Sequence, residues 1–131
     1  MSSKVLQYNN PTLVGEITVP GDKSISHRSV MFGSIAKGKT TVSGFLLGED
    51  CLSTIDCFKK LGVTIDVDGT NVSIDSPGMD AWVEPTEVLY TGNSGTTTRL
   101  MLGILSGTNL HTVMTGDASI GKRPMRRVAD P

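Results

Sequence analysis

An α/β fold is the class that this sequence predicts. Three observations lead to it: segments of helical period alternate with short strand-like segments, glycine or proline stands at most boundaries, and one glycine-led turn recurs three times in 131 residues. Helices that alternate with short strands along one chain are typical of this class. No linker rich in proline, glycine and serine divides the chain, and its 37% hydrophobic and 19% charged residues suit a globular protein.

The first part of the chain predicts two strands around one helix. Residues 13–19 alternate loosely between apolar and polar types until a Pro-Gly pair ends the run, which indicates a strand. Residues 25–36 carry a broad apolar face and precede Gly38, so we expect a helix there. A short strand is expected at 40–42.

A second helix and a hairpin follow. Asp50 is the expected N-cap of a helix that runs to about Leu61, because apolar residues recur every three positions and Gly62 then provides a stop. The two segments 63–67 and 72–74 alternate on either side of an Asp-Gly pair, a strong hairpin signal.

The last part of the chain is expected to start as a loop with two prolines, residues 76–87. The predicted elements after it are a strand at 88–90, a helix at 96–105, a strand at 111–115, and a helix with Pro124 in its first turn that runs to 130. A sequence that stops just after starting a helix indicates a piece of a longer chain.

Charge and hydropathy argue against two classes of partner. The chain has 12 Lys and Arg against 13 Asp and Glu, so no bulk positive field favours nucleic acid. No apolar run reaches the length needed to cross a membrane. Because the first ten residues also lack a signal-peptide pattern, we expect a cytoplasmic protein.

The cysteines predict neither a disulfide nor a metal site. Cys51 and Cys57 are six residues apart, so on one helix their side chains point about 240° from each other. We expect two free, partly buried thiols in a reducing compartment. Since no cluster of His, Cys and acidic residues has metal-ligand spacing, no metal is expected.

One turn pattern recurs before three predicted helices. Each copy has Gly, then Asp or Asn, then Ser within two residues, and an Arg seven residues after the Gly. The copies are Gly21-Asp22-Lys23-Ser24 with Arg28, Gly92-Asn93-Ser94-Gly95 with Arg99, and Gly116-Asp117-Ala118-Ser119 with Arg123. A unit repeated in this way indicates repeated architecture.

These turns suit anions. Glycine lets backbone N–H groups approach a ligand, a helix start presents free N–H donors and a positive dipole end, and Arg matches carboxylate or phosphate with a planar fork. Gly, Asp, Asn and Ser are also common in ordinary turns, so one copy alone does not indicate an anion site. The three copies together, each with an Arg, favour anion binding. A nucleotide P-loop is excluded, because Asp22 and Ile17 stand where that motif needs glycines.

Two residues of the first turn leave their roles open. Lys23 is either a permanent cation that neutralises phosphate or a group with a lowered pKa that exchanges a proton. His27 is either a solvated helix residue or a contact behind the site. No set of nucleophile, base and orienting residue indicates covalent catalysis.

The three turns resemble the signatures of a known family. Three motifs of the 5-enolpyruvylshikimate-3-phosphate synthases are similar, in this order, to residues 20–28, 92–99 and 116–125. The amino-acid sequences of these segments most resemble those of Gram-positive bacterial members. The likeness covers most of the chain from residue 13 to 131. Three motifs in the right order make it specific.

The resemblance implies an activity and an architecture. The family transfers the enolpyruvyl group of phosphoenolpyruvate to the 5-hydroxyl of shikimate 3-phosphate and releases phosphate, by addition and elimination, without a cofactor. Its fold has two lobes of repeated βαβαββ units. By this resemblance, residues 21–131 are an incomplete N-terminal lobe, and residues 1–20 pack with the missing C-terminal lobe. That lobe supplies further acid/base groups, so we expect this piece alone to have little or no turnover.

The resemblance also implies roles for individual residues. Lys23 touches both substrates and takes part in catalysis, Ser24 and Arg28 hold shikimate 3-phosphate, and Gly95 and Arg123 hold phosphoenolpyruvate. Supporting roles fall to three further residues of the second motif: Asn93, Thr96 and Arg99. Leu100 departs from the family, in which many members carry Pro. A glycine at 95 is the pattern of glyphosate-sensitive members.

Two other readings stay open at the level of sequence. The related UDP-N-acetylglucosamine enolpyruvyl transferases usually have Asn after the lysine and a reactive Cys in this half of the chain, whereas here Ser24 follows Lys23 and no Cys follows Cys57. A non-catalytic module that binds anions would keep the same turns, because binding and catalysis share these residues.

Overall fold

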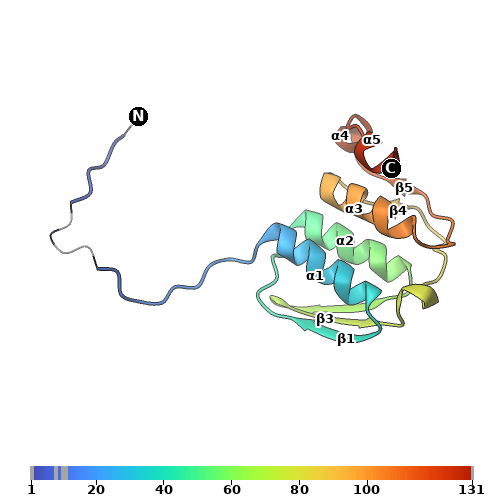
Figure 1. The fold of residues 1–131 in the computed structure, drawn as a ribbon, viewed down its shortest axis with the longest axis horizontal. Coiled ribbons are helices and arrows are strands. Elements are labelled where there is room, and N and C mark those ends of the chain that lie inside the picture. Colours follow the sequence, from blue (N-terminus) through green and yellow to red (C-terminus); the bar gives the residue numbers. More distant parts are fainter. Residues whose placement is uncertain (1, 8, 10–11, 131) are drawn as a thin grey trace.

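The computed structural model describes residues 2–7, 9 and 12–130. Its elements alternate as the sequence predicts, and the α/β class is confirmed (Figure 1). In chain order they are α1 (Lys23–Ile35), β1 (Gly38–Val42), α2 (Glu49–Lys60), β2 (Thr64–Asp68), β3 (Asn71–Ser76), the 3-10 turn η1 (Met79–Ala81), β4 (Leu89–Tyr90), α3 (Gly95–Leu105), β5 (Met114–Thr115), α4 (Ala118–Gly121) and α5 (Arg126–Ala129).

The larger sheet has three antiparallel strands in the order β1-β3-β2. The predicted hairpin is present, because β2 and β3 pair on either side of Gly69, whose φ of 57° suits a tight turn. Along β3, Val72 and Ile74 are buried while Ser73 and Asp75 are exposed. The sheet therefore buries one face and leaves the other to solvent.

Helices α1 and α2 lie side by side over the buried face of this sheet (Figure 1). A glycine on α1 allows the close approach, because a Cβ built on Gly33 would lie 2.8 Å from Cδ1 of Ile74. Phe58 of α2 meets Trp82 edge to face, with ring centroids 5.5 Å apart. These side chains belong to one continuous core that fixes both helices.

The second half of the chain adds a smaller layer beside α2. Strands β4 and β5 pair in parallel, and α3 connects them and packs against α2. From α1 to β3 the order is that of a βαβαββ unit without its first strand, and β4-α3-β5-α4 repeats the start of such a unit. Among the described residues, no helix is long and apolar enough to cross a bilayer.

The predicted strand at 13–19 is wrong. The described residues from 12 to 20 form no strand, and they extend away from the body of the protein (Figure 1). Leu13 and Ile17 are 96% and 87% exposed. A strand needs a neighbour to satisfy its backbone groups, and in this structure the segment has none beside it.

Several boundaries also differ from the prediction. Helix α2 starts earlier, with Gly48 as N-cap, so Asp50 lies in the first turn and does not cap the helix. Strand β5 is shorter than predicted, and the third turn leads directly into the short helix α4, ahead of the helix that was predicted at Pro124. Pro124 precedes α5 instead of standing in its first turn, because Met125 is the N-cap.

Candidate functional site

The N-terminal ends of α1, α2 and α3 lie at the same end of the protein (Figure 1). Two contacts join them: Nζ of Lys23 is 3.3 Å from Oδ2 of Asp50, and the carbonyl oxygen of Asp50 lies 3.4 Å from the hydroxyl oxygen of Thr97. Three helix starts thus present their positive dipole ends and free N–H groups to one region, an arrangement that favours anions.

Each of the three repeated turns is a capped helix start. The side chains of Asp22, Ser94 and Asp117 accept hydrogen bonds from the backbone N–H three residues later, at 2.8, 3.0 and 3.1 Å. The second and third turns follow strands β4 and β5, as predicted, whereas the first follows extended chain. The cap position also differs, because the second turn uses its third residue and the others use their second.

Two of the predicted arginines converge on Gly95. A Cβ built on Gly95 would lie 2.7 Å from Nη1 of Arg123 and 2.8 Å from Nη1 of Arg99, so both guanidinium groups lie directly over the first residue of α3. Arg123 donates a hydrogen bond to Oδ1 of Asn93 at 3.3 Å, and Arg99 donates to the carbonyl oxygen of Pro124 at 3.4 Å. Residues 24 to 30 positions apart in sequence are thereby gathered at one helix start.

The paired guanidinium groups have no counter-charge within the part of the chain that the structure describes. Its ion pairs join Lys23 to Asp50 and Lys60 to Asp56 and Glu87, and none involves Arg99 or Arg123. Nε of Arg99 is also buried without a hydrogen-bond partner among these residues. Two neighbouring cations in this setting favour a bound anion with more than one acidic oxygen.

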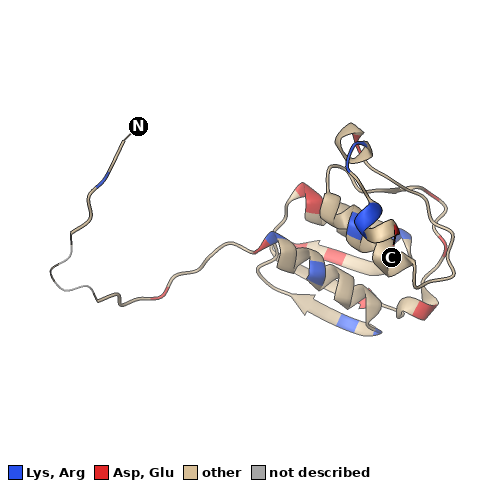
Figure 2. Cartoon of the chain, turned by 45° about the horizontal axis from the view of Figure 1, so that its top comes forward, with Lys and Arg blue, Asp and Glu red and all other residues tan. Residues whose placement is uncertain are grey.

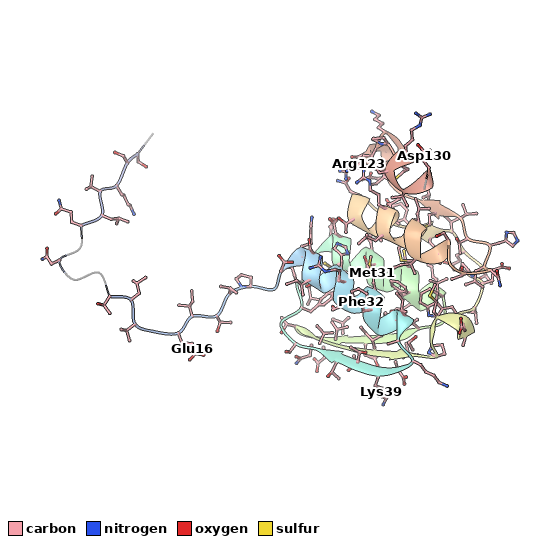
Figure 3. The ribbon with its side chains drawn as sticks, viewed as in Figure 1. Glu16, Met31, Phe32, Lys39, Arg123 and Asp130 are labelled. Carbon is pink, nitrogen blue, oxygen red and sulfur yellow. The ribbon has the colours of Figure 1, made fainter. Side chains whose placement is uncertain are left out.

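The predicted residues of α1 form a second group. The Lys23 side chain is about half exposed and paired with Asp50, while Ser24 and Arg28 are exposed and have no hydrogen bond or ion pair to the described residues around Gly95. Arg28 borders an apolar hollow between α1 and α3, and Met31 and Phe32, labelled in Figure 3, line it too. Thr96 is half-buried. The structure therefore gathers the second and third motifs closely and places the first motif beside them.

Basic residues lie on α1, on α3 and in the segment after β5 (Figure 2). Arg123 lies near the start of α3 in Figure 3. Glu49 and Asp50 in the first turn of α2 are acidic, so the positive charge is local to the start of α3 and the segment after β5, although the net charge of the whole chain is −1. This local field is what an anionic small molecule requires.

Sequence reasoning left the role of His27 open and missed its buried polar partner Thr54. His27 is 1% exposed, so of its two interpretations the solvated helix residue is wrong, and Nδ1 of its ring lies 2.8 Å from the Thr54 hydroxyl. Burial lowers the pKa of His27, the nearby Asp50 carboxylate opposes this shift, and Lys23 adds to it. A signal existed only in the spacing, since His27 follows Lys23 and Thr54 follows Asp50 by one helical turn.

The model of the EPSP synthase family, 3-phosphoshikimate 1-carboxyvinyltransferase, matches residues 8–131. The chain belongs to this family. The 3-phosphoshikimate 1-carboxyvinyltransferase of Bacillus cytotoxicus is 65% identical over 119 residues, which are 91% of this chain and 28% of that protein. The protein of the same name from Oceanobacillus iheyensis is 58% identical over 131 residues, which are all of this chain and 30% of that protein.

A solved structure agrees with these relatives. An EPSP synthase from Acinetobacter baumannii superposes with a TM-score of 0.85 at 53% identity, over 89% of this chain and 27% of that one. The chain therefore spans about 30% of the length of the curated relatives it matches. The family match selects the EPSP synthases over the UDP-N-acetylglucosamine enolpyruvyl transferases, and the identity to Bacillus relatives agrees with the resemblance to Gram-positive members.

Proposed function

We propose that this chain is the N-terminal part of a cytoplasmic enzyme that transfers the enolpyruvyl group of phosphoenolpyruvate to the 5-hydroxyl of shikimate 3-phosphate and releases phosphate. The observation that carries the proposal is the pair of guanidinium groups, Arg99 and Arg123, which converge on Gly95 without a carboxylate partner in the described structure. Residues 21–131 are the incomplete N-terminal lobe. Residues 1–20 pack with the C-terminal lobe, which suits their exposed apolar side chains.

Phosphoenolpyruvate is assigned to the start of α3. Its carboxylate and phosphate are close together, so one small molecule offers several acidic oxygens to two adjacent guanidinium groups. Arg123 binds it directly, and the absence of a side chain at Gly95 leaves room for it. Asn93 orients Arg123 through their hydrogen bond, and Arg99 and Thr96 support the same turn.

Shikimate 3-phosphate is assigned to the start of α1. Ser24 offers a hydroxyl and Arg28 a fork for the phosphate, and both are exposed. Lys23 lies between the two assigned regions, because Asp50 ties it to α2 and the Asp50 carbonyl contacts α3. Its ammonium can therefore touch both substrates and stabilise charge during addition and elimination. No cofactor or metal is needed for this chemistry, and the C-terminal lobe supplies the remaining acid and base groups.

Steady-state kinetics of the complete enzyme test this proposal. Arg123→Gln should lower kcat/KM for phosphoenolpyruvate by about 10- to 150-fold, the value of one charge-assisted hydrogen bond. The matched control is Arg127→Gln, an exposed residue of α5, which should stay within about twofold of wild type. Phosphate release that is absent in the wild type would refute the activity, and saturable binding of both substrates without release would indicate a non-catalytic module.

The separate chain of 131 residues gives a second test. We expect no phosphate release above that of its Lys23→Ala variant, because this lobe lacks the groups supplied by the other. Steady release that Lys23→Ala abolishes would show that the chain is an enzyme without its partner lobe.

A further inference from the structure

A buried chain of hydrogen bonds connects the starts of α1, α2 and α3. Nδ1 of His27 is 2.8 Å from the Thr54 hydroxyl, which is 2.8 Å from the Thr97 hydroxyl, which donates to the Ser94 hydroxyl at 2.7 Å. All four side chains are buried, with exposed fractions of at most 1%. Side-chain hydrogen bonds of this length between buried groups are directional and strengthen one another.

The shortest contacts of these hydroxyl groups define one set of proton positions. A threonine hydroxyl has one hydrogen, and the 2.7 Å contact with Ser94 uses the hydrogen of Thr97 in preference to the Asp50 carbonyl, which is 3.4 Å from Thr97 and 3.5 Å from Thr54. Thr54 must therefore donate to Thr97, and Nδ1 of His27 must carry the proton that it donates to Thr54. The lowered pKa of His27 agrees with a neutral ring of this tautomer. Nε2 is then an unprotonated acceptor, and it is buried without a partner among the described residues.

Three members of this hydrogen-bonded chain are close in sequence to Lys23, to its partner Asp50 and to Gly95. His27 follows Lys23 by four residues on α1, and Thr54 follows Asp50 by four residues on α2. Ser94 precedes Gly95, and its hydroxyl also caps α3 by accepting from the Thr97 N–H at 3.0 Å. The bonds thus fix how the phosphoenolpyruvate turn stands relative to the helix that carries the lysine.

We propose that His27 is a positioning residue, whose Nδ1–H orients Thr54 and Thr97 and so holds the Ser94-Gly95 turn in place for phosphoenolpyruvate. This inference rests on the proposed function. The chain ends on the cap of α3, away from the exposed surface where Ser24 and Arg28 lie. Loss of His27 Nδ1–H therefore affects phosphoenolpyruvate more than shikimate 3-phosphate.

Two substitutions at one position separate positioning from packing. In His27→Asn the amide nitrogen can take the place of Nδ1 and donate to Thr54, whereas in His27→Gln the longer side chain carries its amide to the place of Nε2. In the complete enzyme, we expect His27→Gln to raise KM for phosphoenolpyruvate roughly five- to twentyfold, within the range expected when a buried polar group loses its hydrogen-bond partner, with KM for shikimate 3-phosphate within about twofold of wild type. His27→Asn should retain KM for phosphoenolpyruvate within about threefold despite its smaller volume.

The same enzyme tests transmission along the chain. Thr97→Val removes the hydroxyl and keeps the shape, so it should raise KM for phosphoenolpyruvate as His27→Gln does. In the double variant, KM should rise no further than in the more strongly affected of the two single variants. The positioning role would be overturned if the rise in KM in the double variant equalled the product of the two single rises. It would also be overturned if the variants lowered the melting temperature and left KM unchanged.

A spectroscopic readout does not depend on turnover. Nitrogen-15 NMR of the histidine-labelled wild-type enzyme should show the His27 signal, assigned by its loss in His27→Asn, as the Nδ1–H tautomer. An Nε2–H tautomer would refute the proton arrangement on which the inference depends. If the wild-type enzyme has no turnover, the proposed function fails. This measurement still decides in which direction the hydrogen bonds from His27 to Ser94 are donated.

Discussion

Gly95→Ala is the substitution that most sharply tests the proposed binding of phosphoenolpyruvate at the start of α3. The added Cβ would lie 2.7 Å from Nη1 of Arg123 and 2.8 Å from Nη1 of Arg99. Ordinary van der Waals contact begins near 3.4 Å, so the two guanidinium groups must retreat by 0.7 and 0.6 Å, the differences between 3.4 and the two distances. The backbone need not move, because the contacted atoms are the ends of flexible side chains.

The displacement is large compared with the tolerance of a charge-assisted hydrogen bond. Each such bond contributes about 1.5–3 kcal/mol, so weakening one of them by misplacement should raise KM for phosphoenolpyruvate by about 10- to 100-fold. Stability should not fall, because Gly95 has no positive φ and alanine favours a helix over glycine by up to about 1 kcal/mol. Binding and stability are therefore expected to change in different directions.

The assay is steady-state phosphate release by the complete enzyme, with phosphoenolpyruvate varied at saturating shikimate 3-phosphate and the melting temperature measured in parallel. The matched control is Gly103→Ala on the same helix, where an added Cβ meets nothing within 4 Å. The control should keep the wild-type KM. An unchanged KM in Gly95→Ala, or an equal rise in both variants, would refute the assignment of phosphoenolpyruvate to this helix start.

Four further outcomes follow from the same structure. Burial lowers the pKa of His27 below its ordinary value of 6.5, so the unfolded state binds the proton more readily, and urea unfolding should show stability lost as the pH falls through and below 6.5, less so in His27→Asn. Burial raises the pKa of Cys57 to about 11, so at pH 8 a thiol reagent should modify the Cys57 peptide only after denaturant is added, as mass spectrometry can verify. Asp50→Asn should lower kcat about tenfold, because it releases Lys23. An exposed ion pair contributes only about 0–1 kcal/mol to stability, so the melting temperature should change little, and a large fall in melting temperature would contradict this role. With glycine at 95 the enzyme should be inhibited by glyphosate, and full activity at concentrations that saturate a sensitive relative would disprove it.

Local signals account for the parts of the fold that the sequence predicts well. The Asp-Gly pair at 68–69 gives the hairpin because glycine adopts the positive φ observed there, and Gly62 with φ of 98° ends α2 as expected. The turns at 21 and 92 start helices because a side chain at each one satisfies a free backbone N–H. Each of these turns and helix ends depends on residues within four positions of one another, so it can be predicted without knowledge of tertiary contacts.

The parts that could not be predicted depend on distant partners. Residues 13–19 have the pattern of a strand, but a strand forms only where a neighbour accepts its hydrogen bonds. His27 lies on a turn with polar neighbours, and only its contact with Thr54, 27 residues away, explains its burial. The convergence of Arg99 and Arg123 on Gly95 likewise joins two motifs that sequence reasoning could only count as separate copies.

The three copies of the turn differ in charge, and this difference supports the proposed assignment of phosphoenolpyruvate to α3 and of shikimate 3-phosphate to α1. Carboxylates cap α1 and α4, through Asp22 and Asp117, and each offsets part of the positive helix end that it caps. The cap of α3 is the neutral hydroxyl of Ser94, so that helix end keeps its full positive character, with two guanidinium groups added over Gly95. The start of α3 is thus the most positive of the three turns, and the ligand that presents a carboxylate and a phosphate closest together should occupy it. Of the two substrates, phosphoenolpyruvate meets that description, while shikimate 3-phosphate, whose carboxylate and phosphate are separated by its ring, suits the weaker field and wider surface at α1.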